Sequence, residues 1–490
     1  MLAGPVAAIL TYLLLPAGYV DADGAVVELA PAARKVAAIA VLMAIWWMTE
    51  AISVYATALL PLALFPLAAI ADMKTTATTY GSPVVYLFLG GFILALAVER
   101  WNLHRRLALN VLAVVGANQR AIIGAFMFVA AALSMWVTNT ATTIMLLPVA
   151  VSVIKLLESN DLEDGKADSP FAVGLLLGIA YAASIGGMGT IIGTAPNVFV
   201  VAFIAEQTGR EISFIEWMKF AVPIVIVFVP VVWFLLTRFI YPVSAAKITG
   251  ADSLLEQELS ALAVWSRGEQ LTLVVFLFTA ISWVSRPYLS EVELFGAQPF
   301  AGLTDAGIAI LAAVILFICP VSISKREFLM DWNTAVRLPW GLLVLFGGGL
   351  ALAAQLTDSG LSGYIGYLAS SLEGLPVWLI VMVVVATVVF MTELTSNTAT
   401  TATMLPVFLA LALGLNLPTM LLVLPATLAA SCAFMLPVAT PPNAVVFGSG
   451  YLHMRQMSRA GLWLNLVAIW IISLATWLLI VPAFGITLAG

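Results

Sequence analysis

Apolar runs of about 18 residues or more recur along the whole chain, and they restrict its folding more than any other feature. An α-helix rises about 1.5 Å per residue, so each run can cross the roughly 30 Å hydrocarbon core of a bilayer. Charged residues make up 9% of the chain, whereas soluble domains carry roughly 25%. The sequence therefore predicts an all-α polytopic membrane protein and excludes a water-soluble globule.

The runs predict about eleven transmembrane helices. Their approximate positions are residues 3–19, 36–53, 54–71, 84–100, 171–205, 217–240, 269–285, 303–319, 339–356, 418–447 and 461–484. The first run has no basic stretch before it and no small-residue cleavage site after it, so we expect a retained helix rather than a removed signal peptide. Cys319 and Cys432 lie in apolar runs and are expected to be small buried hydrophobic side chains.

The chain contains an internal duplication. Three segments recur in the same order in both halves: Leu87–Leu96 and 345–354, Thr138–Pro148 and Ser396–Pro406, and Gly193–Val200 and Ala439–Val446. The first two pairs are separated by 258 residues and the third by 246. We predict one membrane domain over residues 1–490, built from a first repeat at 80–240 and a second at 338–484.

Basic residues orient the two halves, because short cytoplasmic loops carry an excess of Lys and Arg. The segments around the first copy contain Arg100, Arg105, Arg106, Arg120, Lys155 and Lys166, and the connection before the second copy contains Lys325, Arg326 and Arg337. No Lys or Arg occurs between Pro339 and Met454. We therefore predict that the first copy is entered from the cytoplasm and the second from the outside, so that the repeats are inverted.

The motifs Thr138-Asn139-Thr140 and Ser396-Asn397-Thr398 lie at the midpoints of apolar stretches at about residues 122–154 and 378–412. Each stretch is too long for one spanning helix and too short for two, which favours a re-entrant helical hairpin. Its tip would be non-helical backbone at membrane depth, tolerated only when buried in protein or lining a wet cavity. Hydroxyl and amide side chains suit such a tip, because they can form hydrogen bonds between helices or bind a substrate or ion. The duplication of the motif favours the binding role.

A second motif pair, Thr194–Asn197 and Thr440–Asn443, places proline inside a long apolar run, where it removes a helical hydrogen bond. Two broken helices facing two hairpin tips would direct helix N-termini at an anion and unwound carbonyls at a cation. None of the four motifs contains Lys or Arg. Co-bound cations must then help to neutralise an anion, and sodium coupling follows as a hypothesis.

Few other residues suggest chemistry. Glu393, beside the second tip, is either a proton or cation site or a structural carboxylate that hydrogen-bonds the hairpin. His104 and His453 are expected in loops, so the sequence gives little support for a metal site or a catalytic triad. Trp46, Trp47 and Glu50 close the second helix and are assigned to interface packing rather than to ligand contacts.

The motifs resemble those of the divalent anion/sodium symporter family, which includes the dicarboxylate carriers of the INDY type. The similarity extends over nearly the whole chain and includes WWMTEAI at Trp46–Ile52, YLFLGGFILALAVERWNLHRRLAL at Tyr86–Leu109, SIGGMGTIIGTAPN, TELTSNTATTATMLP and ATPPNAV. The resemblance implies a homodimer in which a moving transport domain slides against a scaffold domain, as in an elevator.

The resemblance also implies site residues. It places the substrate carboxylates at Asn139, Thr140, Ser396, Asn397, Thr398 and Pro441. It places one sodium ion at Ser134, Thr138, Asn139 and Gly187, and a second at Thr392, Thr395, Asn397 and Ala439. Thr138 stands where the family pattern has serine, which can alter either the preferred substrate size or the ion site.

These observations lead to one expected function and three alternatives. We expect a transporter of the inner (plasma) membrane that imports C4-type dicarboxylates of the succinate, malate and fumarate class, with Na⁺ as coupling ion, no organic cofactor and no nucleic-acid partner. A sodium-independent exchanger of di- or tricarboxylates could use the same fold. An intramembrane enzyme would need a nucleophile and a base at membrane depth. A passive channel fits less well with broken helices in inverted repeats.

Overall fold

The computed structural model describes residues 1–20, 26–116, 118–160, 169–262, 264–293, 297–372 and 374–487. Its regular structure is almost entirely helical, and the all-α prediction is confirmed. Two short antiparallel strand pairs complete it, β1 (Gly18–Val20) with β2 (Val26–Glu28) and β3 (Pro320–Ser322) with β4 (Glu327–Phe328). Lys166, one of the basic residues used for orientation, lies outside the described ranges.

Within these ranges, nine helical segments are long and apolar enough to cross a membrane, or ten if the bent pair at 361–372 and 377–392 forms one span. Six are single helices: α2 (Pro31–Thr49), α9 (Asn139–Asn160), α10 (Pro170–Gly187), α14 (Arg267–Ser290), α17 (Trp340–Asp358) and α20 (Asn397–Gly414). Three include a second element: α5 (Met73–Thr78) with α6 (Pro83–Arg100), α12 (Phe214–Leu235) with a π-turn, and α23 (Met454–Ala475) with α24 (Val481–Ala483).

The remaining helices are shorter. They are α1 (Ala3–Leu14), α3 (Val54–Thr57), α4 (Leu60–Leu67), α7 (Leu103–Leu112), α8 (Gln119–Ser134), α11 (Ala195–Thr208), α13 (Ala251–Ser260), α15 (Asp305–Ile318), α16 (Trp332–Ala335), α18 (Leu361–Ala369), α19 (Val377–Thr392), α21 (Met420–Ala430) and α22 (Pro441–Phe447). Several predicted spans are therefore not continuous. The run at 54–71 divides into α3 and α4, the run at 171–205 into α10 and α11, and the run at 418–447 into α21 and α22. Hydropathy does not detect such breaks, because the connecting residues are as apolar as the helices.

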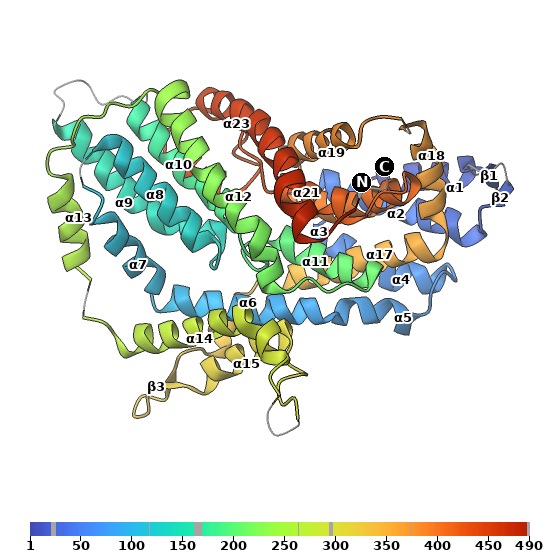
Figure 1. Ribbon diagram of the computed structural model, residues 1–490, viewed down its shortest axis with the longest axis horizontal. Coiled ribbons are helices and arrows are strands. Elements are labelled where there is room, and N and C mark those ends of the chain that lie inside the picture. Colours follow the sequence, from blue (N-terminus) through green and yellow to red (C-terminus); the bar gives the residue numbers. More distant parts are fainter. Residues whose placement is uncertain are drawn as a thin grey trace.

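The predicted hairpins are present as two pairs of contacting helices. Helices α8 and α9 are separated by residues 135–138, and α19 and α20 by residues 393–396, so both breaks keep the 258-residue spacing. Figure 1 shows α8 and α9 near one end of the molecule and α18 near the other, with α11, α12 and α21 between them. Contacts of α9 with α22 and of α20 with α11 connect each hairpin to a broken helix of the other half.

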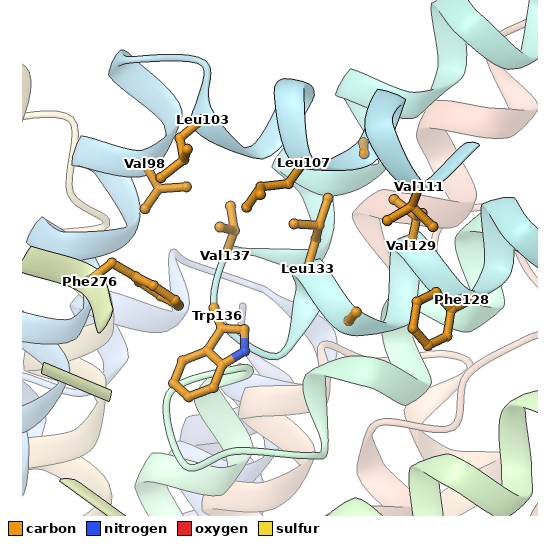
Figure 2. A pocket seen from close by; sticks show the side chains of 12 residues that line it. Val98, Leu103, Leu107, Val111, Phe128, Val129, Leu133, Trp136, Val137 and Phe276 are labelled. Atoms are coloured by element: carbon orange, nitrogen blue, oxygen red, sulfur yellow. The ribbon is translucent and has the colours of Figure 1, made fainter. Parts of the chain in front are cut away.

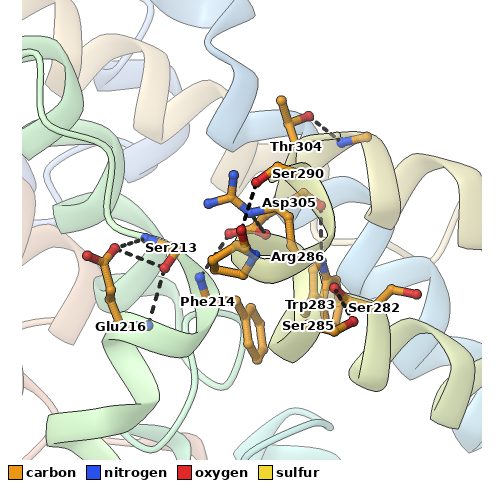
Figure 3. A network of polar contacts seen from close by, with 12 residues as sticks. Ser213, Phe214, Glu216, Ser282, Trp283, Ser285, Arg286, Ser290, Thr304 and Asp305 are labelled. Carbon is orange, nitrogen blue, oxygen red and sulfur yellow. Dashed lines mark hydrogen bonds and ion pairs between the residues drawn. The ribbon is translucent and has the colours of Figure 1, made fainter. Parts of the chain in front are cut away.

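A buried polar network joins three helices (Figure 3). It lies beside the first hairpin tip, because Trp136 of that tip stacks on Phe214 with ring centroids 5.9 Å apart. Asp305, at the start of α15, accepts a hydrogen bond from the backbone N–H of Phe214 at 2.8 Å and pairs with Arg286 of α14 at 2.6 Å. Trp283 donates its indole N–H to the Asp305 carbonyl at 3.0 Å, and its ring stacks on Phe214 at 4.5 Å. The network fixes the N-terminus of α12 against α14 and α15.

One further expectation is corrected by the fold. His104 is not in a loop but is the second residue of α7, with 5% of its surface exposed. Its Nδ1 lies 3.1 Å from the Val98 carbonyl, which is near the end of α6. His453 is the N-cap of α23. Both histidines therefore lie at the start of a helix. No group of three or more metal-ligating side chains occurs among the described residues.

Candidate functional site

A cavity of about 1000 Å³ contains both hairpin tips and both proline-containing breaks. All six residues predicted to hold the substrate line it: Asn139, Thr140, Ser396, Asn397, Thr398 and Pro441. Segments from opposite halves of the chain thus form one site. A second cavity of about 240 Å³, between α7, α8 and α14, has only apolar and aromatic side chains (Figure 2) and offers no comparable polar ligands.

Several helices begin at the large cavity. Asn139 starts α9, Ala195 starts α11 and Asn397 starts α20, and all three residues line the cavity. The first turn of a helix has backbone N–H groups without helical partners and carries a partial positive charge. Three helix starts with this partial charge therefore face one cavity, together with the hydroxyl and amide side chains of the tips, an arrangement of groups that suits an anion.

The first tip has buried oxygen atoms without hydrogen-bond partners. Ser134 Oγ, at the end of α8, and Asn139 Oδ1, at the start of α9, are both buried and unpaired within the described structure. Gly187, at the end of α10, packs against the same amide: a Cβ at Gly187 would lie 2.6 Å from Asn139 Oδ1. Thr138 uses its hydroxyl to accept the Ala141 N–H at 3.3 Å and lines the cavity. Of the four predicted ligands of one cation, Asn139 and Gly187 are therefore in contact, and Thr138 and Asn139 line the cavity.

The second tip already has an internal hydrogen bond. The hydroxyl of Thr392 lies 2.7 Å from Asn397 Oδ1 and 3.0 Å from the Ala430 carbonyl. Three oxygen atoms thus converge near the end of α19. Thr395 has different partners, since its hydroxyl contacts the Met391 carbonyl at 3.0 Å and Thr400 Oγ1 at 2.5 Å. Of the four predicted ligands, Thr392 and Asn397 are brought together, while Thr395 and Ala439 line the cavity.

The two asparagines of the Pro-Asn motifs hold the unwound backbone, a role that the sequence did not reveal. Asn197 donates its amide to the carbonyls of Gly187 at 3.0 Å and Thr190 at 2.8 Å. Asn443 donates in the same way to Ala433 and Leu436, both at 3.0 Å. Both asparagines are fully buried. The 246-residue spacing also relates Gly187 to Ala433, so the correspondence of the two breaks was present in the sequence.

Glu393 is a buried carboxylate with four hydrogen-bond donors. It accepts the backbone N–H groups of Phe434 at 2.6 Å, Met435 at 2.9 Å and Leu436 at 3.2 Å, and the Asn465 amide at 2.8 Å. These contacts agree with a structural carboxylate. However, the bonded segment is the unwound chain that follows α21, not the hairpin itself. Glu393 therefore connects the second tip to the second broken helix.

Charged side chains also line the cavity, and the sequence gave no signal for them as site residues. They are Glu50, Glu99 and Arg337. Glu50, assigned above to interface packing, is exposed and has a left-handed backbone with φ of 46° at the end of α2. Only the three-dimensional arrangement brings these residues to the cavity that contains the tips.

Paired helix breaks around a central polar cavity, within a bundle of membrane-crossing helices, define a multi-pass membrane transporter rather than an enzyme. The chain belongs to the family described as "Sodium:sulfate symporter transmembrane region", whose model matches residues 2–488.

Relatives with assigned functions agree with this family. The chain is 38% identical to the sodium-dependent dicarboxylate transporter SdcS of Staphylococcus saprophyticus over 491 residues, which cover 99% of this chain and 92% of that protein. It is 38% identical to the protein of the same name from Staphylococcus aureus strain MRSA252 over 456 residues, which cover 92% and 86% of the two chains.

Two solved structures share the fold. The YdaH transporter of Alcanivorax borkumensis has a TM-score of 0.59 and 14% identity, with 84% of this chain and 88% of that chain covered. MtrF of Neisseria gonorrhoeae has a TM-score of 0.62 and 10% identity, with 98% and 94% covered. At these identities the likeness concerns the fold alone.

Proposed function

We propose that this chain imports C4-type dicarboxylates together with sodium ions across the inner (plasma) membrane. The carrying observation is the single cavity lined by both hydroxyl and amide tips, without a Lys or Arg in any of the four motifs. The names of the staphylococcal relatives, sodium-dependent dicarboxylate transporters at 38% identity, support both the substrate class and the coupling ion.

In this proposal the two carboxylates of the substrate bind to the amide and hydroxyl groups at the tips. Asn139 and Thr140 receive one end, and Ser396, Asn397 and Thr398 the other, with Pro441 beside them. The unpaired Ser134 and Asn139 oxygens support a sodium ion at the first tip. The neighbouring oxygen atoms of Thr392, Asn397 and Ala430 are the evidence for a second sodium ion, at the second tip. Sodium supplies the positive charge that the motifs lack.

The decisive experiment is uptake of radiolabelled succinate into proteoliposomes containing the purified chain. We expect uptake with an inward sodium gradient and almost none with an equal potassium gradient. Counterflow of succinate that persists without sodium would instead support the sodium-independent exchanger. Equal uptake in sodium and potassium would reject symport.

The inverted arrangement of residues 80–240 and 338–484, the homodimer and the elevator motion are parts of the same proposal. Val114, after α7, and Leu372, after α18, are separated by the same 258 residues and are both exposed. After replacement of Cys319 and Cys432, single cysteines at these two positions should react with an impermeant thiol reagent from opposite faces of the membrane. Labelling from the same face would reject inversion.

A further inference from the structure

The cavity that contains both tips has one cationic side chain among its described lining residues, Arg337. Two carboxylates, Glu50 and Glu99, line the same cavity, and all three side chains are exposed. The tips themselves are uncharged. Fixed charges therefore lie at the periphery of the site, and Arg337 alone has the sign that attracts an anion.

The backbone that carries Arg337 is held in place. Its N–H donates to the Thr334 carbonyl at 3.0 Å, and two nearby residues of the same segment, Ala335 and Leu338, are buried. Asp331 accepts the Thr334 N–H at 2.8 Å and so caps α16. The short connection from α16 to α17 thus presents Arg337 to the cavity from a fixed turn.

Arg337 differs from Arg100, a neighbouring basic residue. Arg100 pairs with Asp331 at 2.5 Å, and the Thr334 N–H together with Arg100 holds the pKa of Asp331 below its usual range. The guanidinium of Arg337 makes no hydrogen bond or ion pair with any residue in the described part of the chain, although two carboxylates line its cavity. Its charge is therefore available to a diffusible ligand.

We propose that Arg337 is a specificity residue that attracts the dianionic substrate in the conformation whose cavity opens toward the cytoplasm. The inference rests on the proposed function. Arg337 follows Lys325 and Arg326 on a connection that the excess of basic residues assigns to the cytoplasmic side. A charge beside a cavity with low-dielectric walls raises the local concentration of its counter-ion. A dianion is attracted more strongly by this charge than a monoanion is.

The test compares the two faces of the membrane with radiolabelled succinate in right-side-out and everted vesicles at constant low sodium. Arg337→Gln should raise KM from the cytoplasmic face at least about three-fold, while KM from the outer face stays within about two-fold of wild type. Arg337→Lys should restore most of the affinity. Added choline chloride should shrink the difference, since the Debye length falls from about 30 Å at 0.01 M to about 8 Å at 0.15 M.

Lys325→Gln is the matched control, because it removes the same charge from an exposed position that does not line the cavity. Monomethyl succinate should lose less affinity than succinate in Arg337→Gln. An unchanged cytoplasmic KM, an equal change on both faces, or failure of lysine to restore affinity would overturn the proposal. Wild-type vesicles without sodium-dependent succinate uptake would reject the proposed function, and the comparison would then use 2-oxoglutarate or sulfate as the dianion.

Discussion

The two hairpin tips have the same sequence pattern but different internal hydrogen bonding. At the first tip, Ser134 and Asn139 have buried oxygen atoms without partners. At the second, the corresponding Thr392 and Asn397 are hydrogen-bonded to each other at 2.7 Å. A cation at the first tip would therefore bind to free oxygens, whereas a cation at the second must replace a hydrogen bond. A duplicated motif thus does not imply two equal ion sites.

The backbone near the two tips differs as well. The first broken helix contains Gly187, against which Asn139 packs, and its second-half counterpart is Ala433. The second break is bound by Glu393, and the residue at the same position of the first half is Met135. The first site depends on space for an amide, and the second depends on a buried carboxylate that holds the unwound chain.

The largest expected effect is the loss of either tip asparagine. Asn139→Ala and Asn397→Ala should each reduce succinate uptake to background, because each side chain serves both the substrate and an ion. Expression and dimerisation should be unchanged. Asn110→Ala, on α7 and outside the cavity, is the control. Wild-type uptake by both tip variants would show that the site is wrong, and loss of folding in both would favour a purely structural role.

Gly187→Ala should selectively damage the first ion site. The added Cβ would lie 2.6 Å from Asn139 Oδ1, so the amide must move. We expect the sodium concentration for half-maximal uptake to rise about ten-fold, equivalent to about 1.4 kcal/mol. Gly81→Ala is the control, since a Cβ there meets nothing within 4 Å. Sodium dependence equal to that of wild type would contradict the placement of this ion.

Ser134→Ala and Thr392→Val should separate ion binding from stability. The Ser134 hydroxyl is unpaired, so its loss should weaken sodium activation with little change in thermal stability. Thr392 contacts both Asn397 and Ala430, so its loss should also cost about 1–3 kcal/mol of stability. Thermal unfolding in detergent, read beside sodium titrations of uptake, measures both quantities. Equal loss of stability in the two variants would remove the distinction between the tips.

The smallest effect is expected at Thr395. Its hydroxyl contacts Thr400 and the Met391 carbonyl rather than Asn397. Thr395→Val should raise the sodium concentration needed for uptake by about two- to three-fold, the loss of roughly one weak hydrogen bond, and should change the maximum rate less. A reduced maximum rate at unchanged sodium dependence would assign Thr395 to the motion of the hairpin instead.

Much of this site could be predicted because its signals are local. The duplicated Asn-Thr motifs located both helix breaks, and their four-residue connections lie within the predicted hairpins at 122–154 and 378–412. The chemistry of the tips also followed from residue type, since hydroxyls and amides are the groups that suit non-helical backbone beside a wet cavity.

The features that escaped prediction depend on long-range contacts. Glu393 reaches residues about 40 positions away, and Arg337 belongs to the cavity only because the connection before α17 folds beside the tips. The sequence predicts a loop at the buried His104 because its basic, polar stretch has the composition of a connector, and only the contact with the Val98 carbonyl near the end of α6 shows otherwise. Hydropathy also did not locate the breaks within the runs at 54–71, 171–205 and 418–447, because broken helices remain apolar across the break.

The most direct test of the account is the mutual dependence of sodium and substrate binding. A dianion held without basic residues at the tips should bind more tightly as sodium rises, and succinate should lower the sodium concentration needed for binding by the same factor. Both dissociation constants can be measured on the purified chain by titrating each ligand at several fixed concentrations of the other. The account predicts equal, reciprocal increases in affinity with sodium and none with potassium. Succinate affinity that is unaffected by sodium, or equally increased by potassium, would contradict it.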